Sequence, residues 1–153
     1  MEAPEYPAND LEGKGAEKTG GRWNAQGTPM LYTSTTMALA CLETIVHLEG
    51  GKSLPLNRYL VRLDVPDDVW AAATTLDPAA HVGWDALPAG KTSIDWGTNW
   101  AASMASALAF VPSVIIPEEF NALVNPRHPD AAKLRATKLR KMAYDPRALG
   151  QTI

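Results

Sequence analysis

Residues 20–50, GGRWNAQGTPMLYTSTTMALACLETIVHLEG, decide the fold that we expect for this chain. After the AQGTP turn, an apolar run with an aromatic and a β-branched residue predicts a short strand over residues 30–33. Ser34, Thr35 or Thr36 can then cap a helix that begins directly afterwards. This unit brings together a glycine-flanked loop, a strand and a helix.

An acidic residue interrupts the apolar side of the predicted helix. At about 100° per residue, one side of the helix carries Leu39, Leu42, Glu43, Val46 and His47. A carboxylate on an apolar side costs several kcal/mol unless it is paired or lines a cavity. Because buried ionisable groups concentrate at functional sites, Glu43 is the first candidate catalytic residue. The alternative is a helix register that puts Glu43 at the boundary with solvent.

Three further side chains are candidates for ligand binding. Arg22 follows two glycines, which let the backbone approach a ligand, and a guanidinium can grip phosphate or carboxylate with two parallel hydrogen bonds. A surface charge is its alternative role. Tyr32 can stack on a planar ring or belong to the core. Ser113 has no GxSxG context, so we interpret its hydroxyl as a hydrogen-bond donor to a ligand rather than a nucleophile.

The rest of the chain predicts short elements separated by proline and glycine. Trp96, Trp100 and Met104 are spaced four apart, and we interpret them as core residues of one helix face. In chain order, we expect an irregular start over residues 1–21, a strand over 58–66, helical turns over 69–73 and 78–80, a helix over 94–106 capped by Ser93, a strand over 113–116, an ordered loop over 121–130 and a last strand ending near Asp145.

The composition is that of one soluble globular domain, with 153 residues of which 46% are hydrophobic. No apolar run approaches the roughly 20 residues that span a bilayer, and the N-terminus is acidic where a secretion signal is basic and then apolar. We therefore expect a cytoplasmic protein. The single Cys41 cannot form an internal disulfide, and the three histidines lack the spacing of a zinc site, so we expect no metal.

The net charge of −3 is spread along the chain, so no strong field attracts a polyanion and we expect no direct nucleic-acid binding. One basic cluster, KLRATKLRK at residues 133–141, is the exception. A solvated face is favoured there over a phosphate-binding patch.

The motifs GGRWN, LYT, LETIVH, VPS, NPRHPD and YDPRAL follow one another in an order and spacing that resemble the RES-domain family. The family is named for an arginine, a glutamate and a serine, which correspond to Arg22, Glu43 and Ser113. The likeness covers about residues 9–149 of a single domain over residues 1–153. Family members commonly begin with a strand of the type xxWRI, so we expect either an alternative start or a missing first strand here.

The resemblance implies a compact α/β (α+β) fold, a small mixed sheet flanked by helices, similar to that of ADP-ribosyltransferases. It also implies a toxin that cleaves the nicotinamide–ribose bond of NAD+, with water, phosphate or, in the alternative, a protein side chain as acceptor. NAD+ is the substrate and no cofactor is needed. The implied roles are these: Glu43 opposes the charge that develops on the ribose, Arg22 grips the pyrophosphate, Tyr32 stacks on nicotinamide, Ser113 hydrogen-bonds the ligand, and Trp23 and Asn24 contribute to the pocket wall.

The family resemblance also implies a partner, an Xre-type helix-turn-helix antitoxin that covers the NAD+ pocket and carries the DNA binding. A homodimer within that toxin–antitoxin complex is compatible with the resemblance. A non-catalytic module that only binds its antitoxin remains a further alternative.

Overall fold

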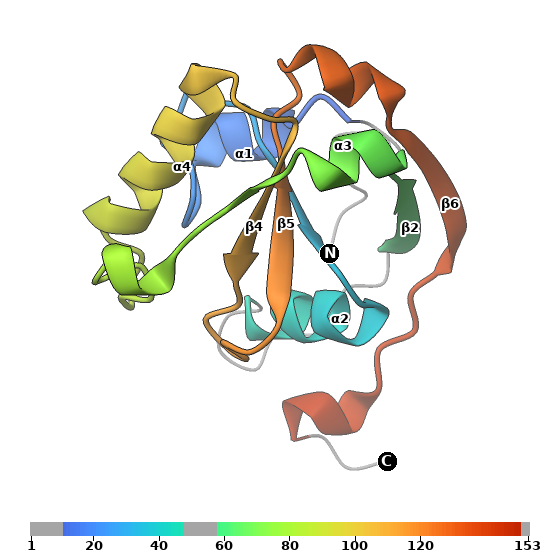
Figure 1. The fold of residues 1–153 in the computed structure, drawn as a ribbon. Coiled ribbons are helices and arrows are strands. Elements are labelled where there is room, and N and C mark those ends of the chain that lie inside the picture. Colours follow the sequence, from blue (N-terminus) through green and yellow to red (C-terminus); the bar gives the residue numbers. More distant parts are fainter. Residues whose placement is uncertain (1–10, 48–57, 151–153) are drawn as a thin grey trace.

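The computed structural model describes residues 11–47 and 58–150, and a four-stranded mixed sheet forms its centre (Figure 1). Its strand order is β1 (Leu31–Ser34), β5 (Phe120–Val124), β4 (Leu108–Pro112) and β3 (Thr74–Thr75). The first three strands pair antiparallel, and β3 joins β4 in parallel. A separate antiparallel ribbon pairs β2 (Tyr59–Asp64) with β6 (Arg135–Lys141). The predicted α/β class with a small mixed sheet is confirmed.

Short helices surround this sheet. They are α1 (Lys14–Thr19), α2 (Met37–Val46), α3 (Asp67–Ala71) and α4 (Lys91–Ser103), with single 3₁₀ turns η1 (Pro78–Ala80), η2 (Pro129–Lys133) and η3 (Pro146–Leu149). Figure 1 shows α4 on one side of the central strands and the β2–β6 ribbon on the opposite side. The expected loss of a first strand concerns residues 1–10, which lie outside the described part of the chain.

The predicted strand–turn–helix unit forms with small shifts. β1 starts one residue later than predicted. Of the three possible caps, Thr36 is used: its Oγ1 accepts a hydrogen bond from the backbone N–H of Leu39 at 3.1 Å. An N-terminal N–H that has no partner inside the helix is satisfied in this way. The sequence signal for this helix start was therefore sufficient.

Several predicted elements are wrong or displaced. The strand expected over residues 113–116 is a bend, and β4 ends just before it at Pro112. The loop expected from residue 121 begins as β5, and α1 lies in the segment expected to be irregular. The helix expected over residues 94–106 begins and ends three residues earlier, after Gly90. The last strand ends at Lys141 rather than near Asp145.

Tryptophans build the core between α4 and the sheet. Trp23 stacks on Trp84 at a centroid distance of 6.4 Å and meets Trp96 edge-on at 5.8 Å. Trp96 stacks on Trp100, which is buried. The interpretation of Trp96 and Trp100 as core residues is confirmed. It is wrong for Met104, which lies just past the helix end and is 43% exposed.

Close packing of α4 depends on one glycine. A Cβ atom on Gly97 would lie 1.8 Å from the carbonyl oxygen of Trp23, so only glycine lets the helix approach this loop. Because Trp23 follows Arg22 in the chain, this contact also fixes the position of the arginine.

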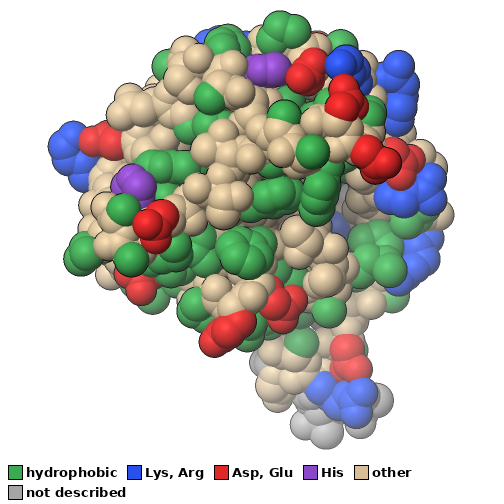
Figure 2. Space-filling model, in the orientation of Figure 1, with side chains coloured by type: hydrophobic (Ala, Val, Ile, Leu, Met, Phe, Trp, Pro, Cys, Tyr) green, Lys and Arg blue, Asp and Glu red, His purple; other side chains and the backbone are tan. Residues whose placement is uncertain are grey.

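The basic cluster at residues 133–141 lies mostly on the exposed β6 strand. Figure 2 shows Lys and Arg side chains along the edge of the molecule where β6 lies in Figure 1. The interpretation of a solvated face fits this exposure.

Candidate active site

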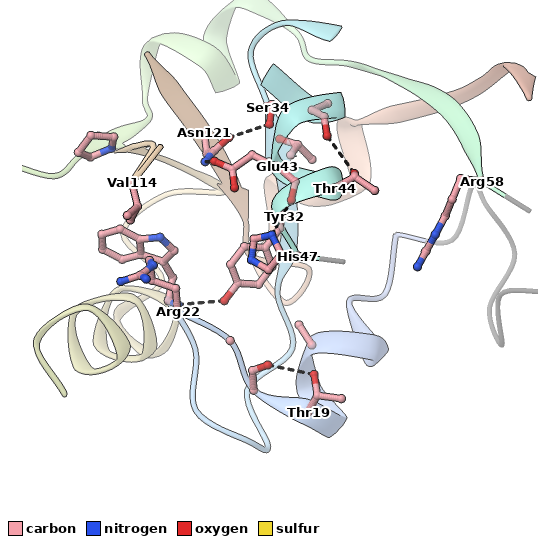
Figure 3. A pocket seen from close by; sticks show the side chains of 17 residues that line it. Thr19, Arg22, Tyr32, Ser34, Glu43, Thr44, His47, Arg58, Val114 and Asn121 are labelled. Atoms are coloured by element: carbon pink, nitrogen blue, oxygen red, sulfur yellow. Dashed lines mark hydrogen bonds between the residues drawn. The ribbon is translucent and has the colours of Figure 1, made fainter. Parts of the chain in front are cut away.

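A cavity of about 630 Å³ opens beside α2, within the size range of about 300–1,000 Å³ that is usual for ligand sites. Four predicted site residues line it: Arg22, Trp23, Tyr32 and Glu43 (Figure 3). Asn24 and Ser113 do not line it, although both contact side chains that do. Residues from the loop, the strand and the helix of the predicted strand–turn–helix unit therefore line one cavity.

The α2 helix turns a different face to the sheet than we expected. Leu39 is its only buried residue, whereas Val46 is 54% exposed. The cavity wall is instead formed by residues at helical spacing: Ala40, Glu43, Thr44 and His47. The prediction of an apolar, core-facing stripe is therefore wrong, and Glu43 lies half-buried in the wall of a cavity.

Two donors hold the Glu43 carboxylate by one oxygen. Ser113 Oγ and Asn121 Nδ2 each donate to Oε1 at 2.8 Å. Within the described residues, Oε2 accepts no hydrogen bond. Hydrogen bonds to an ionised oxygen are stronger than neutral ones, so these contacts fix the side chain while one oxygen remains available for a ligand.

Ser113 has a different contact from the predicted one. Its hydroxyl donates to Glu43 and accepts from the backbone N–H groups of Ile115 and Ile116 at 3.1 and 3.2 Å. The residue is fully buried. Because a hydroxyl has a single proton to donate, the direct bond of Ser113 is to Glu43 and not to a group in the cavity.

Asn121 and Ser34 belong to the site but were missed from the sequence. They are directly paired across β1 and β5, and Ser34 Oγ donates to Asn121 Oδ1 at 2.7 Å. Both line the cavity. The available signal was a polar residue at the start of the apolar run FNALV, which we assigned to a loop.

Arg22 forms part of the wall opposite Glu43, as Figure 3 shows. Its Nη1 donates to the carbonyl oxygens of Trp84 and Ala86 at 3.1 and 2.8 Å. Burial lowers the pKa of the Arg22 guanidinium, and the charges of Asp85 and then Glu43 oppose that shift. Since the carbonyls use only Nη1, the Nε and Nη2 donors can bind a ligand.

Tyr32 and Asn24 brace the loop that carries Arg22. The Tyr32 hydroxyl accepts from the backbone N–H of Trp23 at 3.0 Å and donates to Asn24 Oδ1. The Asn24 amide donates to the carbonyls of Ala16, Ala25 and Thr28. A Cβ on Gly21 would come within 2.7 Å of the Tyr32 hydroxyl, so this packing requires glycine. These contacts give Asn24 a structural role.

We expect the Tyr32 hydroxyl to stabilise the protein only below strongly alkaline pH. Burial raises the pKa of the Tyr32 phenol to about 12, because the hydroxyl end is enclosed although 42% of the residue is exposed. The unfolded chain releases this proton near pH 10, so the stabilisation is complete below about pH 10 and is lost by about pH 12. The free energies of unfolding of the native protein and of Y32F should differ by a constant amount up to pH 10. Above pH 10 this difference should become smaller. A difference that stays constant through pH 12 would contradict this.

The described residues form neither a cluster of metal ligands nor a membrane-spanning helix. In that part of the chain, no group of three or more His, Cys, Asp or Glu side chains could hold a metal ion. None of its helices is long and apolar enough to cross a membrane.

Comparison with known proteins places this chain in a family. The RES domain model matches residues 1–145. The chain is 55% identical to the "Prs ADP-ribosylating toxin" of Sphingobium sp. (strain YBL2), over 97% of this chain and 92% of that protein. It is 35% identical to "Toxin Res" of Yersinia enterocolitica, over 93% and 92%, and 37% identical to "Toxin Res" of Pseudomonas putida, over 80% and 81%. The chain therefore belongs to the RES domain family.

Proposed function

We propose that this protein is a toxin that cleaves NAD+ between nicotinamide and ribose and transfers the ADP-ribose to a protein. The observation that carries the proposal is the anchored carboxylate of Glu43, facing the same cavity as the partly buried side chain of Arg22. The 55% identical relative, whose name describes an ADP-ribosylating toxin, supports a protein as acceptor.

The chemistry needs a negative charge beside the ribose. When the bond between ribose C1′ and the nicotinamide nitrogen breaks, its electron pair leaves with neutral nicotinamide, and positive charge spreads over C1′ and the ring oxygen. This transition state is similar to that of other glycosidic cleavages. Glu43 Oε2 can oppose that charge or hold a ribose hydroxyl. The acceptor's nucleophile then bonds to C1′ and loses its proton.

In this proposal, Arg22 binds the pyrophosphate of NAD+, on the far side of the ribose from nicotinamide. The carbonyls of Trp84 and Ala86 hold Nη1 and so orient the plane of the guanidinium. The remaining donors can form a forked contact with the pyrophosphate. Tyr32 and Trp23 supply aromatic surface to the same cavity, and a stack of Tyr32 on nicotinamide remains our prediction.

Labelled NAD+ tests both the cleavage and the acceptor. Purified protein, free of antitoxin, is incubated with NAD+ and with a Prs protein, the target in the relative's name. We expect nicotinamide release and label on the Prs protein. If free ADP-ribose forms rapidly and no protein band is labelled, the reaction is hydrolysis rather than transfer to a protein. If the phosphate adduct of ADP-ribose forms in phosphate buffer instead, the reaction is phosphorolysis. Folded protein that releases no nicotinamide would contradict the proposal and favour a non-catalytic module.

We also infer an antitoxin partner, because relatives carry the name "Toxin Res". An Xre-type helix-turn-helix protein that covers the cavity would block NAD+. Copurification with the product of an adjacent helix-turn-helix gene, together with loss of nicotinamide release, would support this inference. A complex that retains full activity would contradict it.

Substitutions of Arg22 separate charge from geometry. R22A should weaken NAD+ binding more than R22K, since lysine keeps the positive charge but lacks the fork and cannot hold both carbonyls and phosphate. We expect a rise in the Kd for NAD+ of about 100-fold for R22A, from the loss of charged hydrogen bonds each contributing about 1.5–3 kcal/mol. Titration calorimetry with NAD+ measures the effect. R62A, on the exposed β2 strand, is the control. Native affinity in both Arg22 variants would show that Arg22 does not contact the ligand.

A further inference from the structure

We propose that Asn121 is a positioning residue for the reaction: it holds Glu43 Oε1 so that Oε2 faces the substrate. The kinetic test of this role rests on the proposed function, because it measures nicotinamide release from NAD+. It concerns a residue outside the Arg–Glu–Ser set for which the family is named, and it follows from three contacts in the wall of the cavity.

The orientation of the Asn121 amide is fixed from both sides. Ser34, its direct partner across the β1–β5 pair, donates to Oδ1 at 2.7 Å. Nδ2 then donates to Glu43 Oε1 at 2.8 Å. An ionised carboxylate can only accept and an NH₂ group can only donate, so the amide has one productive orientation.

Glu43 needs both of its donors because they come from different directions. Ser113 follows β4, Asn121 lies on β5, and Glu43 itself lies on α2. One hydrogen bond alone leaves the carboxylate free to rotate about the axis of that bond. The second removes this rotation, which keeps Oε2 at the place where the ribose charge develops. A misplacement of about 1 Å can cost about 100-fold in rate.

A direct contact with NAD+ is the competing role, because Asn121 also lines the cavity. The two roles predict different kinetics. Loss of a ligand contact raises KM, whereas a misaligned Glu43 lowers kcat with little change in KM. Thermal unfolding of each variant shows whether it is folded.

Variant N121A should lower the kcat of nicotinamide release about 10- to 100-fold, with KM for NAD+ within about 3-fold of native. The control N99A, on the exposed face of α4, should keep native values. A native kcat in N121A, or a raised KM with an unchanged kcat, would overturn the proposal.

Variant N121D makes the test independent of side-chain size. Two adjacent carboxylates share one proton, and a protonated carboxyl can donate to Glu43 as the amide does. Activity relative to native should therefore be highest at low pH and fall as the shared proton is lost. Arg22, Tyr32 and His47 also line the cavity with Glu43, but they are the same in both proteins, so the ratio of N121D to native activity isolates position 121.

The ratio of N121D to native activity, measured as a function of pH, also tests the proposal if N121A fails to fold. Recovery of N121D at low pH supports the positioning role, and a ratio that does not change with pH overturns it. If native protein does not turn over NAD+, the proposed function fails separately. A crystal structure of N121A then decides: Glu43 displaced from its native rotamer supports the role, and Glu43 in place on Ser113 overturns it.

Discussion

E43Q is expected to lower the rate of nicotinamide release about 1,000-fold while leaving the fold intact. The substitution removes the negative charge that opposes the developing charge of the ribose, and single preorganised electrostatic contacts are worth about 100- to 1,000-fold in kcat. The amide oxygen of glutamine can still accept from Ser113 and Asn121, so the two anchoring bonds remain possible. The loss therefore reports on charge rather than on structure.

Nicotinamide release at saturating NAD+, with thermal unfolding of the same samples, measures the effect of E43Q. The matched control E118Q changes an exposed glutamate. In cells, we expect expression of the native protein to arrest growth and E43Q to relieve that arrest. Native turnover in E43Q would remove Glu43 from the reaction, and unrelieved toxicity would favour a module that acts without catalysis.

G97A is expected to cost at least about 3 kcal/mol of unfolding free energy, at the upper end of overpacking effects. The new Cβ would lie 1.8 Å from the Trp23 carbonyl oxygen and 2.7 Å from its carbon. These are backbone atoms, so the contact can be relieved only by moving α4 or the loop. At an open helix position, the same change would stabilise by up to about 1 kcal/mol through helix propensity. The sign of the change in unfolding free energy therefore tests whether α4 packs this closely against the loop.

Denaturant unfolding of G97A and of N99A, two positions along the same helix, measures the cost. In the G97A molecules that remain folded, displacement of Trp23 should shift Arg22 and weaken NAD+ binding. A G97A protein as stable as native would show that α4 does not approach the loop as closely as the structure places it.

Local signals in the sequence were sufficient for the strand–turn–helix unit. The AQGTP turn and the threonine cap each determine the structure of only a few neighbouring residues. They predicted the first residues of β1 and α2 to within one or two positions. Glu43 attracted attention as an acid on an apolar side. Its actual neighbour is a cavity, since only Leu39 of that side is buried.

Long-range pairing could not be predicted from the sequence. Ser34 and Asn121 are 87 residues apart, and only the register of β1 against β5 brings them together. The prolines at 112 and 117 suggested a strand between them, but Pro112 ends β4, and residues 108–111 before it had been assigned to no element. A cross-strand contact leaves no periodic signal in either segment.

The order in which the chain is synthesised has a consequence for the anchored carboxylate. Arg22 and Glu43 lie in the first third of the chain, whereas Ser113 and Asn121 follow Glu43 by 70 and 78 positions. A ribosome that stops before codon 121 releases a fragment that has the acid but lacks the amide that aims it. Interrupted translation before that codon therefore yields a product without the assembled centre, which can form only after residue 121 has been added to the chain.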